Sequence, residues 1–179
     1  MSDLADIMDQ PLRTLVGGAK NNNPASALPV LAINAAAAAT WRTTAAIQSI
    51  FDGLHTTRAA LAAQAFAANA VQQQRVNGQS GFITVPATRT CFFAFAVNAA
   101  GTPFVIQGTP TGLPFYQNGV ARIGDGFFPD VGEELALFGG LKVVCGVNPF
   151  IPNTTALDAA TFTNTFRDMA MKPAADVPF

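Results

Sequence analysis

His55 is the side chain best suited to proton transfer near neutral pH, and it is the only histidine in the sequence. Nucleophilic catalysis needs a base within reach of a nucleophile and a third group that orients the base. One histidine also leaves no histidine pair for a metal. Because His55 lies beside Asp52-Gly53, a dipeptide typical of tight turns, we expect a solvent-facing imidazole there rather than a catalytic one.

A cluster of acids follows Ile123 and comprises Asp125, Asp130, Glu133 and Glu134. Carboxylate and backbone oxygens are the ligands that Ca²⁺ takes in proteins, but these acids do not have the spacing of an EF-hand. The sequence favours a solvated loop here. It leaves calcium binding by the stretch Asp125–Glu134 open.

Two cysteines, Cys91 and Cys145, each lie in an apolar run, "RTCFFAFAV" and "LKVVCGV". They could form a disulfide, but buried free thiols are the commoner outcome in a reducing compartment. The chain also lacks the G-x-S-x-G, phosphate-loop and C-x-x-C motifs. We therefore expect neither enzymatic activity nor a cofactor.

Charged residues make up only 12% of the 179 residues, while apolar residues make up 50%. The usual charged share is roughly 25%, and a soluble monomer uses its charges to stay apart from its neighbours. A surface so poor in charge predicts that partners cover much of it. The net charge of −1, without a basic run, argues against nucleic acid and against an anionic membrane surface as partners.

No stretch of the sequence approaches the roughly 18–20 apolar residues of a membrane span. The N-terminus "MSDLADIMDQ" is acidic and lacks the features of a secretory signal, so we expect synthesis in a cytoplasm. The first residues differ from the rest of the chain, because a short run with helical spacing ends at Pro11 and a linker rich in Gly, Asn and Pro follows. Two turns of helix are not stable alone. The segment is either a frayed tail or an arm that orders on a neighbour, and its candidate contact residues are Leu4, Ile7, Met8, Leu12 and Leu15.

The stretch "AAIQSIFDGLHTTRAAL" (45–61) contains residues that favour a helix and residues that favour a β-hairpin. Its alanines favour helix, whereas its threonines are stiff at χ1 and Asp-Gly is the preferred loop of a two-residue hairpin. We favour the hairpin, which would place Phe51 opposite Leu54 and Ile47 opposite Arg58.

The residue patterns in the second half of the chain predict β-strands. "CFFAFAV" is apolar on both of its alternating faces, which is typical of a central strand in a sandwich or in a sheet packed on a neighbour. "NAAG" then predicts a four-residue turn with glycine last, and "TFTNTF" predicts a further strand.

Short strands between Gly, Pro and Asn turns, with little helical periodicity after residue 70, predict an all-β protein. The expected architecture is an antiparallel β-sandwich or barrel with an extended N-terminal arm. We expect an arm and linker over residues 1–35, a sandwich domain over 36–173 and a surface tail over 174–179.

Four blocks of sequence stand in a characteristic order: "RTTAAIQSIFDGLHTTRAALAAQAF" (42–66), "TCFFAFAVNAAGTPFVIQG" (90–108), "FPDVGEELALFGGLKVV" (128–144) and "NPFIPNTTALDAATFTNTFRDMAMKP" (148–173). In order and spacing they resemble a group of small virion structural proteins of tailed bacteriophages. The resemblance covers about residues 40–173. Segment 109–127 is an insertion relative to the shared pattern, and the N-terminal arm lies outside it.

The resemblance implies a non-enzymatic virion component, made in the host cytoplasm. Our leading hypothesis is a capsid decoration (cement) protein that binds the major capsid protein through its arm and stabilises the shell. By analogy with the three-fold sites of icosahedral shells, it would self-associate, as a homotrimer. A tail, collar or fibre component is the alternative within this class. A carbohydrate-binding module for host recognition is another, but such modules display aromatic side chains for stacking, and Trp41 and Tyr116 are the only Trp and Tyr here.

Overall fold

The computed structural model describes residues 25–51, 54–66, 70–72, 82–117, 120–123, 128–129, 131 and 134–170. These residues form strands and turns, without helices. The strands are β1 (Ala25–Ala27), β2 (Leu31–Ile33), β3 (Thr40–Thr43), β4 (Ile47–Phe51), β5 (Leu54–Arg58), β6 (Gln64–Ala65), β7 (Ala70–Gln72), β8 (Thr90–Asn98), β9 (Pro103–Gln107), β10 (Pro114–Gln117), β11 (Val120–Ile123), β12 (Leu135–Cys145) and β13 (Phe162–Asp168). The all-β class expected from the sequence is confirmed.

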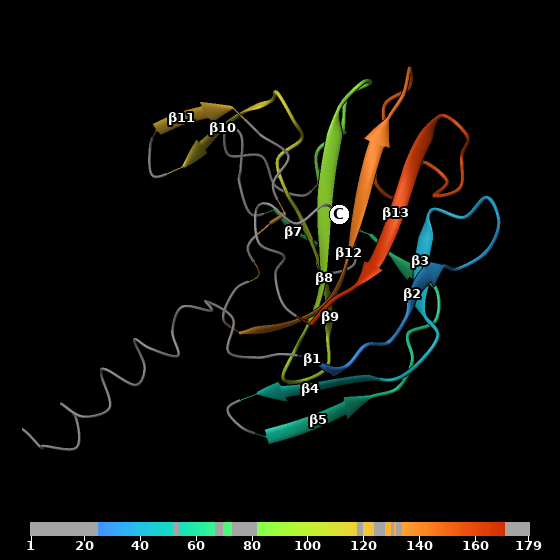
Figure 1. Cartoon of the computed structure of the whole chain (residues 1–179), viewed down its shortest axis with the longest axis vertical. Helices are drawn as coiled ribbons and strands as arrows, with labels where there is room; N and C mark the ends of the chain where they lie inside the picture. Colours follow the sequence, from blue (N-terminus) through green and yellow to red (C-terminus); the bar gives the residue numbers. More distant parts are fainter. Residues whose placement is uncertain are drawn as a thin grey trace, which may run out of the picture.

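A five-stranded sheet in the order β13-β12-β8-β9-β7 forms the centre of the protein (Figure 1). Its neighbours run antiparallel except for β7 and β9, which pair in parallel. The two longest strands, β8 and β12, lie side by side inside the sheet. The turn between β8 and β9 has the form expected for "NAAG": Gly101 donates its N–H to the carbonyl of Asn98 and has a φ of +78°.

Strand β8 is buried on both faces, as the alternation of "CFFAFAV" predicts. Cys91, Phe93, Phe95 and Val97 belong to the larger core cluster, which we call the inner core. Ala94 and Ala96 belong to a smaller cluster on the opposite face, the outer core. A strand in third place of a five-stranded sheet has hydrogen-bonded neighbours on both edges, so only side chains can cover its faces.

The outer core is closed by the chain itself. Phe128, Val131 and Met169 pack over Ala96 and Leu137. Ala96 and Leu137 are fully buried as a result. The sequence left open whether a neighbouring chain covers this second face. The structure shows that no neighbour is needed over the centre of the sheet, because the protein's own connecting segments lie there.

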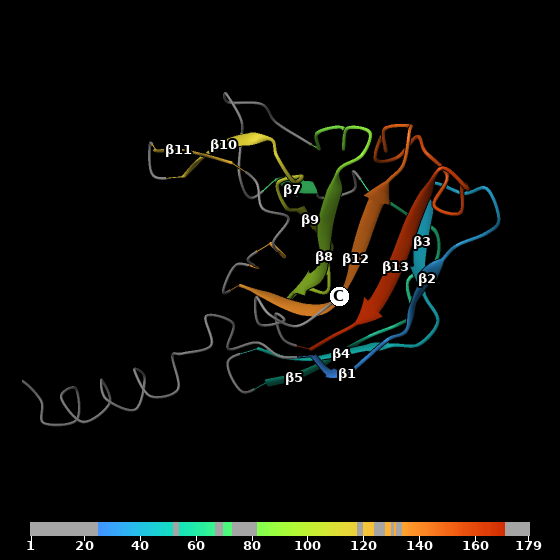
Figure 2. The same cartoon turned by 45° about the horizontal axis from the view of Figure 1, so that its top comes forward.

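Two small sheets cover the inner face, β2-β3-β6 and β1-β4-β5 (Figures 1 and 2). Trp41 of β3 lies in the middle of this contact, with ring centroids 4.7 Å from Phe95 and 6.2 Å from Phe138. Ile47 and Phe51 of β4 join the same core. The result is a sandwich-like body whose aromatic layer holds sheets from distant parts of the sequence together.

The hairpin in the 45–61 stretch is confirmed in its full register. Strands β4 and β5 pair antiparallel with Phe51 opposite Leu54 and Ile47 opposite Arg58. Two residues link the strands, so a helix is excluded at this place. The pair at the tip does not share one environment, however, since Phe51 is buried and Leu54 is 69% exposed.

The alanine-rich segment that precedes this hairpin is also not helical. Residues 35–39 form a turn in which Ala37 has a φ of +56°. Its N–H donates to Asp158 Oδ2, and Leu157 donates its N–H to the carbonyl of Ala38. These bonds to a segment about 120 positions away replace the local bonds of a helix, so tertiary structure outweighs the propensity of alanine.

The folded body extends to the N-terminal side of the boundary expected at residue 35, because it already includes β1 and β2. Ala25 and Leu31 are 6% and 7% exposed and belong to the inner core. Leu31 donates its N–H to Asp168 Oδ1 at 2.7 Å, which ties β2 to the end of β13. Residues 1–24, with the predicted contact residues of the arm, and the tail after residue 170 lie outside the described part of the chain.

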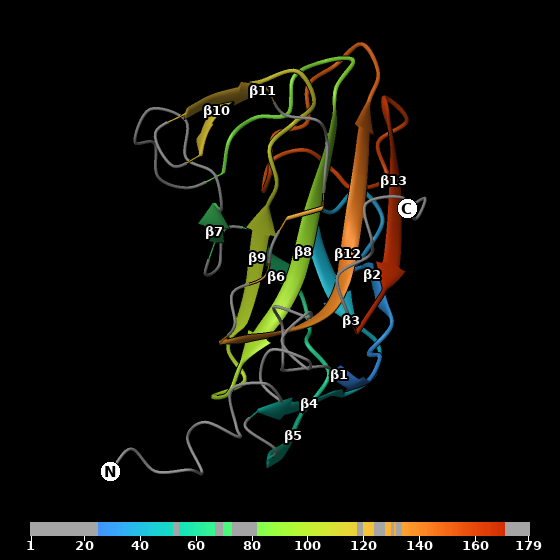
Figure 3. The same ribbon diagram turned by 60° about the vertical axis from the view of Figure 1, so that its left-hand side comes forward.

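The structure also contains a second hairpin, which was not predicted from the sequence. Strands β10 and β11 pair antiparallel from Pro114 opposite Ile123 to Gln117 opposite Val120, within segment 109–127, for which no strand was predicted. They form a separate two-stranded sheet beside the upper end of the central sheet (Figure 3). The signal was present, since Asn118-Gly119 is a preferred two-residue hairpin loop.

Candidate functional site

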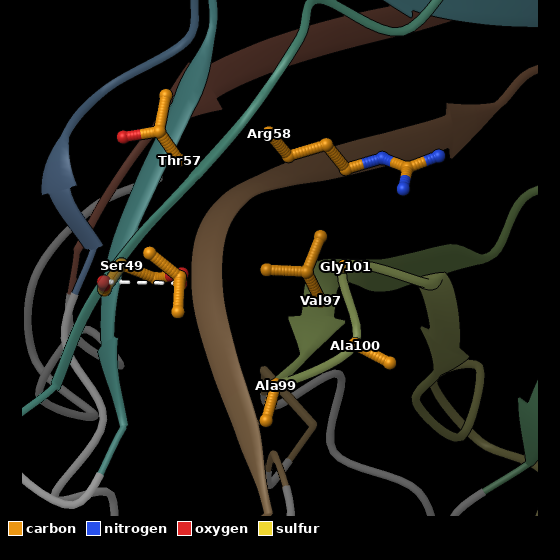
Figure 4. A pocket seen from close by; sticks show the side chains of 8 residues that line it. Ser49, Thr57, Arg58, Val97, Ala99, Ala100 and Gly101 are labelled. Carbon is orange, nitrogen blue, oxygen red and sulfur yellow. Dashed lines mark hydrogen bonds between the residues drawn. The ribbon is translucent and has the colours of Figure 1, made fainter.

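A small pocket lies between the β4–β5 hairpin and the turn that joins β8 to β9 (Figure 4). Its volume is about 130 Å³. We call it the Arg58 pocket, and its lining residues are Ser49, Thr56, Thr57, Arg58, Val97, Ala99, Ala100 and Gly101. Two segments about 40 positions apart in the sequence therefore build it together.

Arg58 covers one side of this pocket. Its side chain runs over the turn, so that a β-carbon at Gly101 would lie 3.1 Å from Arg58 Nη1 and 3.3 Å from Cδ. The Nε atom is buried and has no hydrogen-bond partner among the described residues. A buried guanidinium nitrogen without an acceptor is unusual, because buried donors are nearly always paired.

Ser49 and Thr56 form the opposite side of the pocket and bond to each other. Their hydroxyl oxygens are 3.0 Å apart, and Thr56 Oγ1 also donates to the carbonyl of Ser49 at 3.2 Å. Figure 4 shows Ser49 across the pocket from the turn that holds Ala99, Ala100 and Gly101. Cross-strand hydroxyl pairs of this kind stabilise a hairpin, so the wall of the pocket is held in place.

His55 is exposed on β5, opposite Ile50, and is not among the residues that line the pocket. The solvent-facing position expected from the sequence is confirmed. Of the acids after Ile123, only Glu134 is described, and it is exposed; Asp125, Asp130 and Glu133 lie outside the described residues. No group of three or more His, Cys, Asp or Glu side chains that could hold a metal occurs in the described ranges.

Both cysteines are free and buried, as expected. Burial raises the pKa of the Cys91 thiol well above its ordinary value, although a hydrogen bond from Gln107 acts in the opposite direction. Burial likewise raises the pKa of Cys145. A thiol that resists ionisation is a poor nucleophile, so these residues fit a packing role.

Several large apolar side chains remain exposed on the described surface, and they come from separate elements. Val147 is 84% exposed and Leu54 is 69% exposed. The others are Leu28, Val30, Val144 and Ile151, at 37–49%. On the outer face of the central sheet, Val144 lies in the same strand as Lys142, whose Nζ is 5.8 Å from the ring centroid of Phe92.

A comparison with protein-family models, with curated proteins and with solved structures finds no match for this chain. Within the described residues there is no helix with the length and apolar content that a membrane crossing requires.

Proposed function

We propose that this chain is a non-enzymatic structural protein of a bacteriophage virion, and specifically a capsid decoration protein. In this proposal the β-body lies on the outside of the shell and self-associates, as a homotrimer. The N-terminal segment, with Leu4, Ile7, Met8, Leu12 and Leu15, docks onto the major capsid protein. The chain is made in the host cytoplasm and acts in the virion.

The observation that carries the proposal is the charge-poor surface. Only 12% of the residues are charged, about half of the usual share. Because the faces of the central sheet are covered by the chain's own segments, this depletion concerns the outer surface rather than an oversized core. Exposed apolar side chains such as Val147 and Leu54 make the same surface more apolar. Such a surface suits a protein that works against partners.

In this proposal many copies of the chain bind over the capsid lattice, and this repetition is what stabilises the shell. A single apolar arm makes a modest contact, but copies that are linked through their bodies bind with a high effective concentration. Many weak contacts across capsomer boundaries then add to a large stabilisation of the shell. The order of the four sequence blocks, which resembles small phage virion proteins, supports the same assignment.

Deletion of residues 1–24 tests the arm. The deletion ends before β1, because Ala25 is already part of the inner core. We expect the shortened chain to fold but to lose at least about tenfold in affinity for undecorated capsids, which corresponds to about 1.4 kcal/mol. The matched control replaces Leu4, Ile7 and Met8 by alanine in the full-length chain. Undiminished binding by both variants would remove the arm from the mechanism.

A tail, collar or fibre component is the second candidate in this class, and copy number distinguishes the two. The carbohydrate-binding alternative is disfavoured by the position of Trp41, which is 1% exposed and packed between Phe95 and Phe138. A buried indole offers no platform for a sugar ring.

A further inference from the structure

We propose that the Arg58 pocket binds a carboxylate group. Arg58 is the only charged residue among the eight that line the pocket. No acid in the described ranges forms an ion pair with it, and its buried Nε lacks an acceptor there. The buried Nε is itself closed to a ligand, so a bound anion would be received by the two terminal nitrogens of the guanidinium, which carry the same charge.

The hydroxyl groups of the pocket limit how many negative oxygens it can take. Thr56 uses its proton on the carbonyl of Ser49, so the 3.0 Å bond between the two side chains is donated by Ser49. Both protons are then occupied. Arg58 is the side-chain donor left to a ligand, because the hydroxyl of Thr57 points away from the turn (Figure 4). A single cation matches a singly charged carboxylate better than a phosphate dianion, whose further oxygens would face lone pairs.

The volume of the pocket sets the size of the ligand. About 130 Å³ is far more than the ~10–15 Å³ that one water needs, and less than the ~300–1,000 Å³ of sites for drug-sized ligands. A carboxylate with one or two carbons fits, and a whole sugar ring or nucleotide does not. The planar guanidinium is suited to such a group, because its N–H fork matches the two oxygens of a carboxylate.

The pocket is open to a ligand from outside. Ala99 and Ala100 at its rim are exposed, and Gly101 with its positive φ lets the turn pass close beneath the arginine. A free small acid and the Asp or Glu side chain of a neighbouring protein present the same carboxylate at this rim. The experiment below separates these two sources. The site does not depend on the proposed virion function.

The test is a titration of the ¹⁵N-labelled full chain with sodium acetate, followed by NMR at the Arg58 Nε–H and the Gly101 amide. Sodium chloride at equal ionic strength is the control. We expect saturable shifts at both groups with acetate and none with chloride. Arg58→Gln should abolish the Gly101 shift, while Arg42→Gln, which removes an equal charge from an exposed position on β3, should preserve it. Equal shifts with chloride, or an unchanged Gly101 response in Arg58→Gln, would overturn the proposal.

A second variant guards against loss of folding in Arg58→Gln. Ala100→Leu narrows the rim from an exposed turn position and leaves Arg58 in place. We expect it to weaken acetate binding at least about tenfold. Acetate binding of full strength in this variant would also contradict the assignment.

Further probes identify the source of the carboxylate. Aspartate blocked at both backbone ends should bind at least as tightly as acetate if the pocket receives an acidic side chain. Exclusion of blocked aspartate, with acetate still bound, would assign the pocket to a free small acid. Inorganic phosphate that binds more tightly than both would overturn the carboxylate.

Discussion

Leu31 of β2 packs directly onto the backbone of Gly139 in β12, leaving no room for a β-carbon at that glycine. The carbonyl oxygen of Arg167, 3.1 Å from the same position, closes the other side. Gly139 also follows an irregularity in the β8–β12 register, which lies between Leu137 and Gly139. A segment expected to be linker is thus fixed to the central sheet by a contact that only glycine permits.

Gly139→Ala is expected to destabilise the protein by about 1–3 kcal/mol, the usual cost of overpacking. Leu31 is 7% exposed, so its side chain cannot move aside freely. Urea unfolding gives the change in the free energy of unfolding. Leu31→Val in the same chain should recover part of the loss, and additive effects of the two substitutions would contradict a direct clash.

Trp41 makes the inner core observable, because it is the only tryptophan in the sequence. Its side chain is 1% exposed, so the native emission should be blue-shifted and should move to the red on unfolding. Trp41→Ala should cost about 3–5 kcal/mol. Trp41→Phe should cost clearly less, because it keeps most of the packing and removes an Nε1–H that has no partner among the described residues. Equal costs for the two variants would refute this account.

Gln107 is fully buried and holds the segment at residues 82–85 through two hydrogen bonds to the backbone of Ile83. Its Oε1 accepts from the N–H of Ile83, and its Nε2 donates to the carbonyl of Ile83, both at 2.8 Å. Gln107→Leu should cost about 1–3 kcal/mol, since both backbone groups lose their partner. The matched control is Gln64→Leu, which removes a single exposed bond to Ala62 and should change stability by less than about 0.5 kcal/mol.

The buried thiols predict a loss of stability in alkaline solution. Burial raises the pKa of Cys91 in the folded state above the ordinary value of 9.0, so the unfolded chain releases this proton first. The stabilisation is complete below pH 9.0 and decreases as the pH rises above it. The urea midpoint should therefore fall between pH 8 and pH 10, and Cys91→Ala should reduce that fall. An identical pH dependence in the variant would show that other groups cause it.

Sequence reasoning succeeded where a local pattern carries the structure. The alternation of Cys91 to Val97 predicted a strand with two buried faces, and Asp52-Gly53 predicted a hairpin whose register the pairing of Phe51 with Leu54 confirms. The threonine alternation around Phe162 likewise predicted β13. In each case the residues that decide the conformation are neighbours in the chain.

Prediction from the sequence failed where contacts between distant segments determine the structure. Nothing near Leu31 in the sequence indicates Gly139 or Asp168, so β2 looked like linker. Arg58 meets Gly101 only because the hairpin and the β8–β9 turn converge in space. The pocket therefore could not have been predicted from spacing. The hairpin of β10 and β11 is different, because Asn118-Gly119 is a local signal that is sufficient to predict it.

The central claim, that the chain decorates a capsid, is tested most directly by its copy number in purified particles of the phage proposed to encode it. The measurement compares the intensity of its band with that of the major capsid protein on one gel. The account predicts a ratio close to a simple fraction of the capsid subunits, with hundreds of copies per particle. A ratio that corresponds to about six to a few dozen copies would indicate the tail instead, and absence of the band from particles would contradict a virion role altogether.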